Sequence, residues 1–322
     1  MSNDYSPKPI EDLMKHLSEA RGIEVRSEQT RQMLNYGYYH AYKGYRFFKN
    51  AKSQIPYTAF EQIIAVIDYD NALKAAFYPE IMFLETALKN IVVASVIDGL
   101  PSAEFKEVIR KRMSDEKDDE VLQRQRKRLK EKINTTIGKR TTKNNEIISH
   151  FEEKGNGMPI WAIFEILSLG DFATFTYCLN NHTRVSLLRD LHMYIDEDVT
   201  HQLLSSILYT LKDLRNALAH NNVVFDTRFS EREINPAVCS WLTKELSITG
   251  IDFSSIIDYY LLIAVLLQKI EYNDEKIQSF ITEIEGCVNT LYQKVPQNIY
   301  QKLTTTQCLT KLKALTEYIA RS

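Results

Sequence analysis

The stretch LKDLRNALAHNN, residues 211–222, continues a run of leucines that recur every three or four positions. These leucines are Leu204, Leu208, Leu211, Leu214 and Leu218. At about 100° of rotation per residue they fall in one sector of a helix, so the pattern predicts an amphipathic helix from about Glu197 to His220. Arg215 falls just inside this apolar sector. Burying a guanidinium is costly unless the group is paired, so Arg215 needs a carboxylate or a phosphate as its partner.

The same helical spacing of apolar residues recurs through most of the 322-residue chain. Glycine and proline number only 10 and 8, and no series of alternating strands is present, so the sequence predicts an all-α fold. We expect a flexible tail at 1–9, a helical and aromatic extension at 10–58, a helical core at 59–275 and C-terminal helices at 276–322. Within the core we expect a charged insertion at about 112–150.

Glycines and prolines also predict where individual helices end. Gly22 is placed to end the first helix, which begins at Ile10. Pro79 is expected to break the long helical region at 59–98 into two helices. Gly170 is expected to end a later helix.

Composition excludes several classes of protein. A formal net charge of −2 gives no basic field over the whole protein, so any nucleic acid must bind a local patch. The four cysteines form no C-x-x-C pair, which is typical of reduced cysteines in a cytosolic protein. The first residues do not resemble a secretory signal, and the longest apolar run, 259–267, is too short to span a bilayer. We therefore expect a cytoplasmic protein with no membrane partner, in which this run is a buried helix.

Three residues of the opening helix have the chemistry needed to act on a phosphodiester. Arginine offers a planar fork of donors that matches two phosphate oxygens, and histidine exchanges protons near neutral pH. Asparagine can hydrogen-bond to either one and orient it. Arg215, Asn216 and His220 together suit RNA cleavage by attack of the ribose 2′-OH, which requires no metal. One histidine does not easily serve as both base and acid in one step, so we expect two copies of the chain to complete the site.

A structural explanation of the same residues remains open. Arg215 can pair with a carboxylate such as Glu85, Asp171 or Asp213. His220 can simply end the helix, where a cation is favoured. On this interpretation the helix carries no active site.

Two segments carry the composition of nucleic-acid-binding surfaces. The strongly basic segment 124–143 follows an acidic one at 114–120, and Lys43 and Arg46 lie among the aromatic residues of 36–48. The cations of the basic segment that we expect to contact RNA are Arg124, Arg126, Lys127, Arg128, Lys130, Lys132, Lys139 and Arg140. A second interpretation stays open for both segments: the adjacent charges neutralise one another, and the aromatic rings pack the first helices onto the core.

The motif R-N-x-x-x-H resembles the R-x4-H motif of the HEPN superfamily of helical ribonucleases. Four flanking stretches occur in the order expected of the Abi family of abortive-infection proteins (Abi_2), of the AbiD and AbiF type. They are KPIEDLMKHL at 8–17, GYYHAYKGYRFF at 37–48, PIWAIFEILSLGDF at 159–172 and LRNALAHNN at 214–222. The resemblance spans roughly residues 8–275.

This resemblance implies a bacterial protein with a HEPN-type helical bundle that acts as a toxin-like endoribonuclease in phage defence, as a homodimer and without a cofactor. It makes Arg215 and His220 the catalytic pair and Asn216 the orienting residue. It also implies RNA as substrate and a structured noncoding RNA as a regulatory partner, in a toxin–antitoxin arrangement. The alternative is a non-catalytic HEPN module that binds RNA or a partner protein. Many relatives carry a second histidine and an arginine where this chain has Asn221 and Asn222, which leaves the role of that histidine open.

Overall fold

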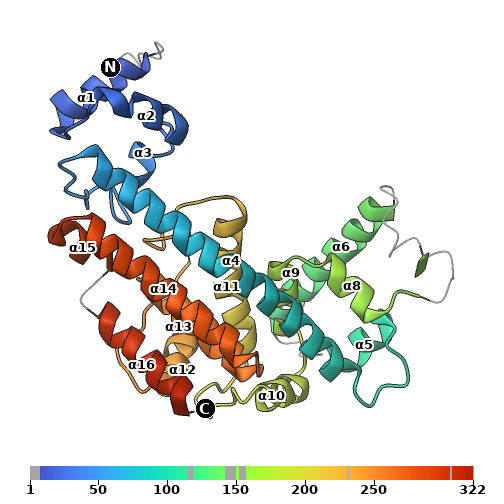
Figure 1. The fold of residues 1–322 in the computed structure, drawn as a ribbon. Helices are drawn as coiled ribbons and strands as arrows, with labels where there is room; N and C mark the ends of the chain where they lie inside the picture. Colours follow the sequence, from blue (N-terminus) through green and yellow to red (C-terminus); the bar gives the residue numbers. More distant parts are fainter. Residues whose placement is uncertain are drawn as a thin grey trace.

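The computed structural model describes residues 8–114, 119–141, 150–151, 157–230, 232–304 and 307–321. In these ranges the regular elements are helices, joined by loops with isolated β-bridges, which confirms the all-α prediction (Figure 1). The first helices are α1 (Ile10–Arg21), a 3₁₀ turn (Ser27–Gln29), α2 (Thr30–Tyr36), α3 (Tyr42–Tyr45), α4 (Phe60–Ile97), α5 (Phe105–Arg112) and α6 (Glu120–Thr141). Next come α8 (Ile160–Ile166), α9 (Leu169–Tyr177), α10 (Asn181–Asp190) and α11 (Leu203–Ala219). The last are α12 (Pro236–Leu246), α13 (Ile256–Lys269), α14 (Asp274–Lys294), α15 (Gln297–Thr304) and α16 (Cys308–Arg321).

Helix α4 extends from the N-terminal helices to α5 and packs against α11, α13 and α14 (Figure 1). The prediction that Pro79 breaks this segment is wrong, because α4 continues through it. Proline removes one backbone hydrogen bond, the one to the carbonyl of the residue four positions earlier. That residue, Ala75, is exposed, so water can replace the missing N–H. The buried Phe77 and Ile81 hold the helix in place on either side of the proline.

The glycine predictions have different outcomes. Helix α1 ends at Gly22, whose φ of 64° is the left-handed conformation expected of a glycine after a helix. The prediction that Gly170 ends a helix is wrong, because α8 already ends at Ile166. The Ser168 hydroxyl accepts a hydrogen bond from the Asp171 backbone N–H at 3.2 Å and starts α9. Gly170 therefore lies in the first turn of a new helix.

Helix α11 carries the predicted motif. It begins at Leu203, later than the predicted start near Glu197, because the Asp198 carboxylate accepts a hydrogen bond from the Leu203 backbone N–H at 2.8 Å. His201, with a φ of 52°, cannot belong to a right-handed helix. All five leucines of the apolar sector are buried, which confirms the amphipathic pattern. They pack α11 against α9 and α4.

The C-terminal helices add to the same core. Residues 259–267 are buried throughout, which confirms the buried helix predicted for this run. Helix α16 packs against α13, where the buried Lys311 donates to Oδ1 of the buried Asp258 at 2.6 Å. No helix in the described ranges is long and apolar enough to cross a membrane. The division into a core at 59–275 with separate extensions stays a prediction. Of the predicted tail at 1–9, residues 1–7 lie outside the described part of the chain.

Candidate functional site

Arg215 is held by an acidic side chain of α4. Its Nε donates to Oε2 of Glu85 at 3.2 Å, and Nζ of Lys89 lies 2.9 Å from the other carboxylate oxygen. The Lys89 ammonium also donates to the Leu167 carbonyl at 2.9 Å. Glu85 thus accepts one cation on each of its oxygens. Of the three carboxylates that the sequence offered as partners for Arg215, the structure selects Glu85.

This ion pair leaves part of the arginine unused. The Arg215 side chain is 30% exposed, whereas that of Glu85 is 9% exposed. Among the residues that the structure describes, Nη1 and Nη2 of Arg215 have no hydrogen-bond partner. The cluster holds two cations against one carboxylate and is therefore positive. The pair explains why a charge is tolerated within the apolar sector, and it leaves the guanidinium fork available to an anion.

His220 is exposed at the end of α11, where the chain forms a Schellman motif. The Asn222 backbone N–H donates to the Ala217 carbonyl at 2.8 Å, and the Asn221 N–H donates to the Leu218 carbonyl at 3.2 Å. Asn221 has a φ of 54°, and asparagine tolerates this left-handed conformation better than most residues. The backbone conformation of this turn therefore gives Asn221 a structural reason to occupy the position after His220.

Asn216 lines a cavity of about 520 Å³ beside α11. Neither Arg215 nor His220 lines it. In the described part of the chain, no hydrogen bond joins the side chains of these three residues. Five residues turn a helix by about 140°, so Arg215 and His220 leave α11 in different directions. One chain by itself thus does not bring the three predicted catalytic side chains into contact.

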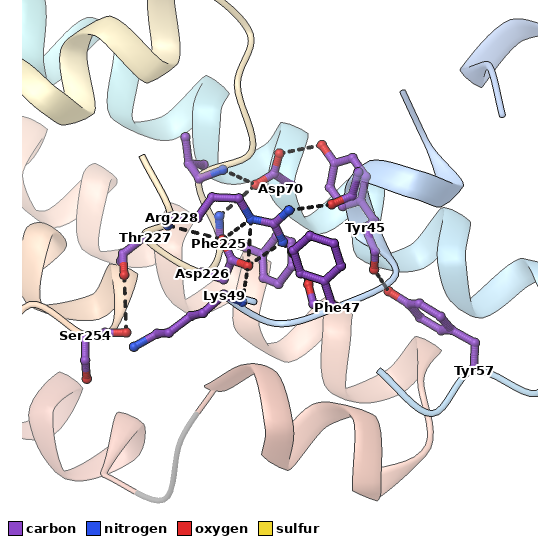
Figure 2. Close-up of polar contacts among 12 residues, drawn as sticks. Tyr45, Phe47, Lys49, Tyr57, Asp70, Phe225, Asp226, Thr227, Arg228 and Ser254 are labelled. Atoms are coloured by element: carbon purple, nitrogen blue, oxygen red, sulfur yellow. Dashed lines mark hydrogen bonds and ion pairs between the residues drawn. The ribbon is translucent and has the colours of Figure 1, made fainter. Parts of the chain in front are cut away.

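A second carboxylate of α4 fixes the chain just after the motif. Oδ1 of Asp70 accepts hydrogen bonds from the backbone N–H groups of Val224 and Phe225, each at 2.8 Å (Figure 2). Its Oδ2 accepts from the Tyr45 hydroxyl at 2.7 Å and forms an ion pair with Nζ of Lys74 at 2.8 Å. Asp70 is fully buried, and burial together with this charge raises the pKa of Tyr45. The hydroxyl therefore stays protonated and remains a donor.

Lys74 connects this carboxylate to the end of the motif helix. Its Nζ donates to Oδ1 of Asn221 at 2.9 Å, so one ammonium holds both α4 and the turn after His220. We did not identify Asp70 or Lys74 from the sequence. The available signal was a carboxylate inside a long, mostly apolar helix, because a buried charge of this kind requires several donors.

A third carboxylate joins the same turn to the aromatic segment. Nε of Arg228 donates to both oxygens of Asp226, at 2.8 and 2.9 Å, and its Nη atoms donate to the carbonyls of Gly44 and Phe47 at 2.7 and 2.8 Å. Figure 2 shows the guanidinium beside the ring of Phe47, whose centroid lies 4.6 Å away. Asp226 also accepts from the Lys49 backbone N–H at 2.7 Å. Every donor nitrogen of Arg228 is used inside the protein.

The aromatic segment itself divides into buried and exposed rings. Tyr38 and Tyr42 are buried, as the packing interpretation of this segment required. Tyr39 is 69% exposed, and Nζ of Lys43 lies 4.6 Å from the centre of its ring. Arg46 is half-buried and lies against a phenylalanine ring. RNA contacts of Lys43 and Arg46 stay predictions.

Helix α6 has one apolar and one basic face. Leu122, Leu129 and Ile133 are buried, and α6 packs against α8 and α9. The predicted cations that are exposed are Arg124, Lys127, Arg128, Lys130 and Lys132. Arg126 is half-buried and donates to the Ser114 carbonyl at 2.7 Å, which anchors the helix. The side chains of Lys139 and Arg140 lie outside the described part of the chain, and RNA contacts of this segment stay predictions.

The fold and this site define an all-helical protein with cationic and amide side chains gathered at the end of one packed helix. A family model described as Abi-like protein matches residues 31–226, a span that contains α4, α11 and the motif. The match covers more than half of the chain, which therefore belongs to the Abi-like protein family. No curated protein and no solved structure matches the chain.

Proposed function

We propose that the chain is a metal-independent endoribonuclease of the HEPN type that acts in phage defence by abortive infection. One observation carries this proposal: Glu85 holds Arg215 through Nε, while both Nη groups are unpaired within the described residues. An arginine held in this way is preorganised to bind a phosphate with two parallel hydrogen bonds. Membership of the Abi-like family supports the role in abortive infection.

In this reaction the ribose 2′-OH attacks the adjacent phosphorus, and the bond from phosphorus to the 5′-oxygen breaks. Arg215 stabilises the charge on the phosphoryl oxygens, and His220 exchanges the proton. Asn216 is the orienting residue that the motif implies. The products are a 2′,3′-cyclic phosphate and a free 5′-hydroxyl. Because Arg215 and His220 of one chain diverge, a homodimer in which two motifs face each other supplies both the base and the acid.

The RNA reaches this site along the exposed cations of α6, with Lys43 and Arg46 as further contacts. A toxin-like nuclease must be restrained, and a structured noncoding RNA bound to the same cations is the partner that we propose. This arrangement requires no base-specific contact with the cations, because lysine and arginine bind the phosphate backbone of any RNA.

End-labelled RNA incubated with the protein in EDTA tests the proposal. The wild type is expected to cut and to leave cyclic phosphate ends. Arg215→Ala and His220→Ala are each expected to lower cleavage by about 10²-fold or more. Arg110→Ala, which breaks another Arg–Glu pair, and His182→Ala, which removes an exposed histidine, are the matched controls and are expected to cut normally. Cleavage that requires added metal, or that survives both substitutions, would contradict the mechanism.

A second candidate is a non-catalytic HEPN module that binds RNA or a partner protein. The Arg215–Glu85 pair favours it, since a paired arginine in a single chain already has a structural role. RNA binding by the wild type and by both motif variants, without cutting, would support this candidate.

A further inference from the structure

The cavity beside α11 contains polar side chains, above all the carboxamides of Asn216 and Asn222, that make no hydrogen bond within the described residues. The residues that line it include Lys212, Asp213, Asn216, Asn222, Arg228 and Arg232. Its volume of about 520 Å³ lies in the range of pockets that hold small organic groups. It adjoins the motif, because Asn216 lines it and Arg215 is the preceding residue.

The charged groups of this cavity are largely engaged. Nε, Nη1 and Nη2 of Arg228 all donate within the protein, to Asp226 and to two backbone carbonyls, so most of its hydrogen-bonding capacity is used there. Nζ of Lys212 lies 2.7 Å from Oδ1 of Asp213, which offsets much of its charge. Arg232 is exposed and has no ion-pair or hydrogen-bond partner for its guanidinium among the described residues. Of these charged groups, Arg232 is therefore the one left to contact a phosphate at the rim of the cavity.

The two carboxamides differ from these charges because both are free. The side chains of Asn216 and Asn222 have no hydrogen-bond partner in the described part of the chain. Asn216 comes from the last turn of α11, and Asn222 from the turn that follows it. Each carboxamide presents one acceptor and two donors, and this combination pairs with the edge of a nucleobase. Proteins that recognise unpaired RNA place such groups in pockets that accept a splayed base.

We propose that this cavity binds an unpaired nucleobase of an RNA, with Asn216 and Asn222 hydrogen-bonding to its edge. This inference rests on the proposed function, because it takes RNA as the substrate. It adds that the site recognises one unpaired base of that RNA. Arg232 contacts the phosphate of the same nucleotide from the rim of the cavity. Asn216 is then a specificity-determining residue that selects the base next to the phosphate bound by Arg215, in place of the orienting role that the motif implies.

Binding of RNA to protein that carries His220→Ala tests the proposal without any cleavage. The probes are labelled homopolymers of adenylate, cytidylate and uridylate, each about ten nucleotides long, a length within the usual range of single-strand sites. We expect the His220→Ala protein to prefer one homopolymer by about tenfold, which is typical of one good amide–base contact. Adding Asn216→Ala or Asn222→Ala should remove the preference. Both variants should fold, because Asn216 is exposed on a helix and Asn222 caps α11 through its backbone N–H.

Two further variants separate the contributions. Arg232→Ala should weaken binding of all three homopolymers equally and reduce the salt dependence by about one phosphate contact. Asn289→Ala, which removes an exposed asparagine of α14 outside the cavity, is the matched control and should change nothing. Free nucleoside monophosphates should displace the bound homopolymer only weakly, because they lack the flanking nucleotides.

Three results would overturn the proposal. They are the absence of a base preference, a preference that survives both asparagine substitutions, and tighter binding of a free mononucleotide than of the matching homopolymer. Failure of the proposed nuclease activity is distinguishable from each of these, because the assay measures binding alone. A protein that binds with this preference but never cuts RNA would keep the inference and would contradict only the reaction.

Discussion

Asp70 and Glu85 are both buried carboxylates of α4, and they differ in how completely they are satisfied. Asp70 accepts three hydrogen bonds, two from backbone N–H groups and one from Tyr45, forms an ion pair with Lys74 and is fully buried. Glu85 accepts only two side-chain cations, and one of them, Arg215, is 30% exposed with its Nη groups unpaired among the described residues. The first carboxylate is saturated by the protein, and the second presents a cation to the outside.

This difference separates a structural charge from a functional one. The bonds made by Asp70 offset the desolvation of its charge and fix the chain around it. Removing this carboxylate should therefore destabilise the folded protein. A carboxylate that holds a partly exposed arginine contributes less to stability, because the arginine can also be solvated by water. Removing the Glu85 carboxylate should therefore change the binding of a phosphate by Arg215 more than it changes the stability of the fold.

The largest expected effect is that of Asp70→Ala. It leaves two buried backbone N–H groups, the Tyr45 hydroxyl and Lys74 without their acceptor, so we expect the free energy of unfolding to fall by about 3–5 kcal/mol. Urea denaturation followed by circular dichroism measures this. Asp68→Ala is the matched control, since Asp68 accepts one bond, from Tyr36 at 3.1 Å, and should cost about 1 kcal/mol. Equal losses for the two variants would show that Asp70 is not the anchor of this turn.

A smaller effect is expected at the turn itself. Asn221→Ala removes the acceptor of Lys74 and places alanine, which tolerates the left-handed conformation less well than asparagine, at a φ of 54°, so it should cost about 1–2 kcal/mol. Asn221→Gly also loses the acceptor but adopts this φ freely, so it should cost less than Asn221→Ala. Asn222→Ala is the adjacent control and should leave the melting temperature unchanged, because its cap uses the backbone N–H. If Asn221→Ala is as stable as the wild type, the left-handed residue does not determine the identity of this position.

Exposed cations that no carboxylate among the described residues holds should affect binding without affecting stability. Replacing the exposed Arg124, Arg128 and Lys132 of α6 with glutamate should leave the free energy of unfolding within about 0.5 kcal/mol of the wild type. The same triple variant should flatten the salt dependence of RNA affinity by about two units, at roughly 0.7 per phosphate contact on a single strand. Arg126→Glu, which breaks the bond to Ser114, should instead destabilise the protein. An unchanged salt slope in the triple variant would assign this face to solvent.

Local features of this fold could be predicted from the sequence, and long-range contacts could not. The leucine spacing before Arg215 identified the apolar sector of α11, because burial follows the helical period. Pro79 misled the prediction, since the rule for a helix in isolation ignores the packing that holds α4 together on both sides. Gly170 misled it too, because the capping hydroxyl of Ser168 determined the helix start.

The site shows the same limit. Arg215 was expected to need a partner, and Glu85 was one of three carboxylates named for it, but these residues lie 130 positions apart in the chain. Periodicity fixes the direction in which each side chain points and cannot select among partners on other helices. The network around Asp70 was missed altogether, because its donors are backbone N–H groups and a tyrosine that no motif connects.

Glu85→Gln provides the most direct test of the claim that α4 holds Arg215 in place for a phosphate. The amide keeps the shape of the side chain and one acceptor, but its NH2 group faces one of the two cations, so the free energy of unfolding should fall by about 1–3 kcal/mol, less than for Asp70→Ala. RNA cleavage in EDTA should nevertheless fall by about tenfold, through kcat more than through KM, because the guanidinium loses the charge that orients it. Cleavage at the wild-type rate would contradict the claim. So would a loss of cleavage activity that the fraction of unfolded Glu85→Gln protein fully explains.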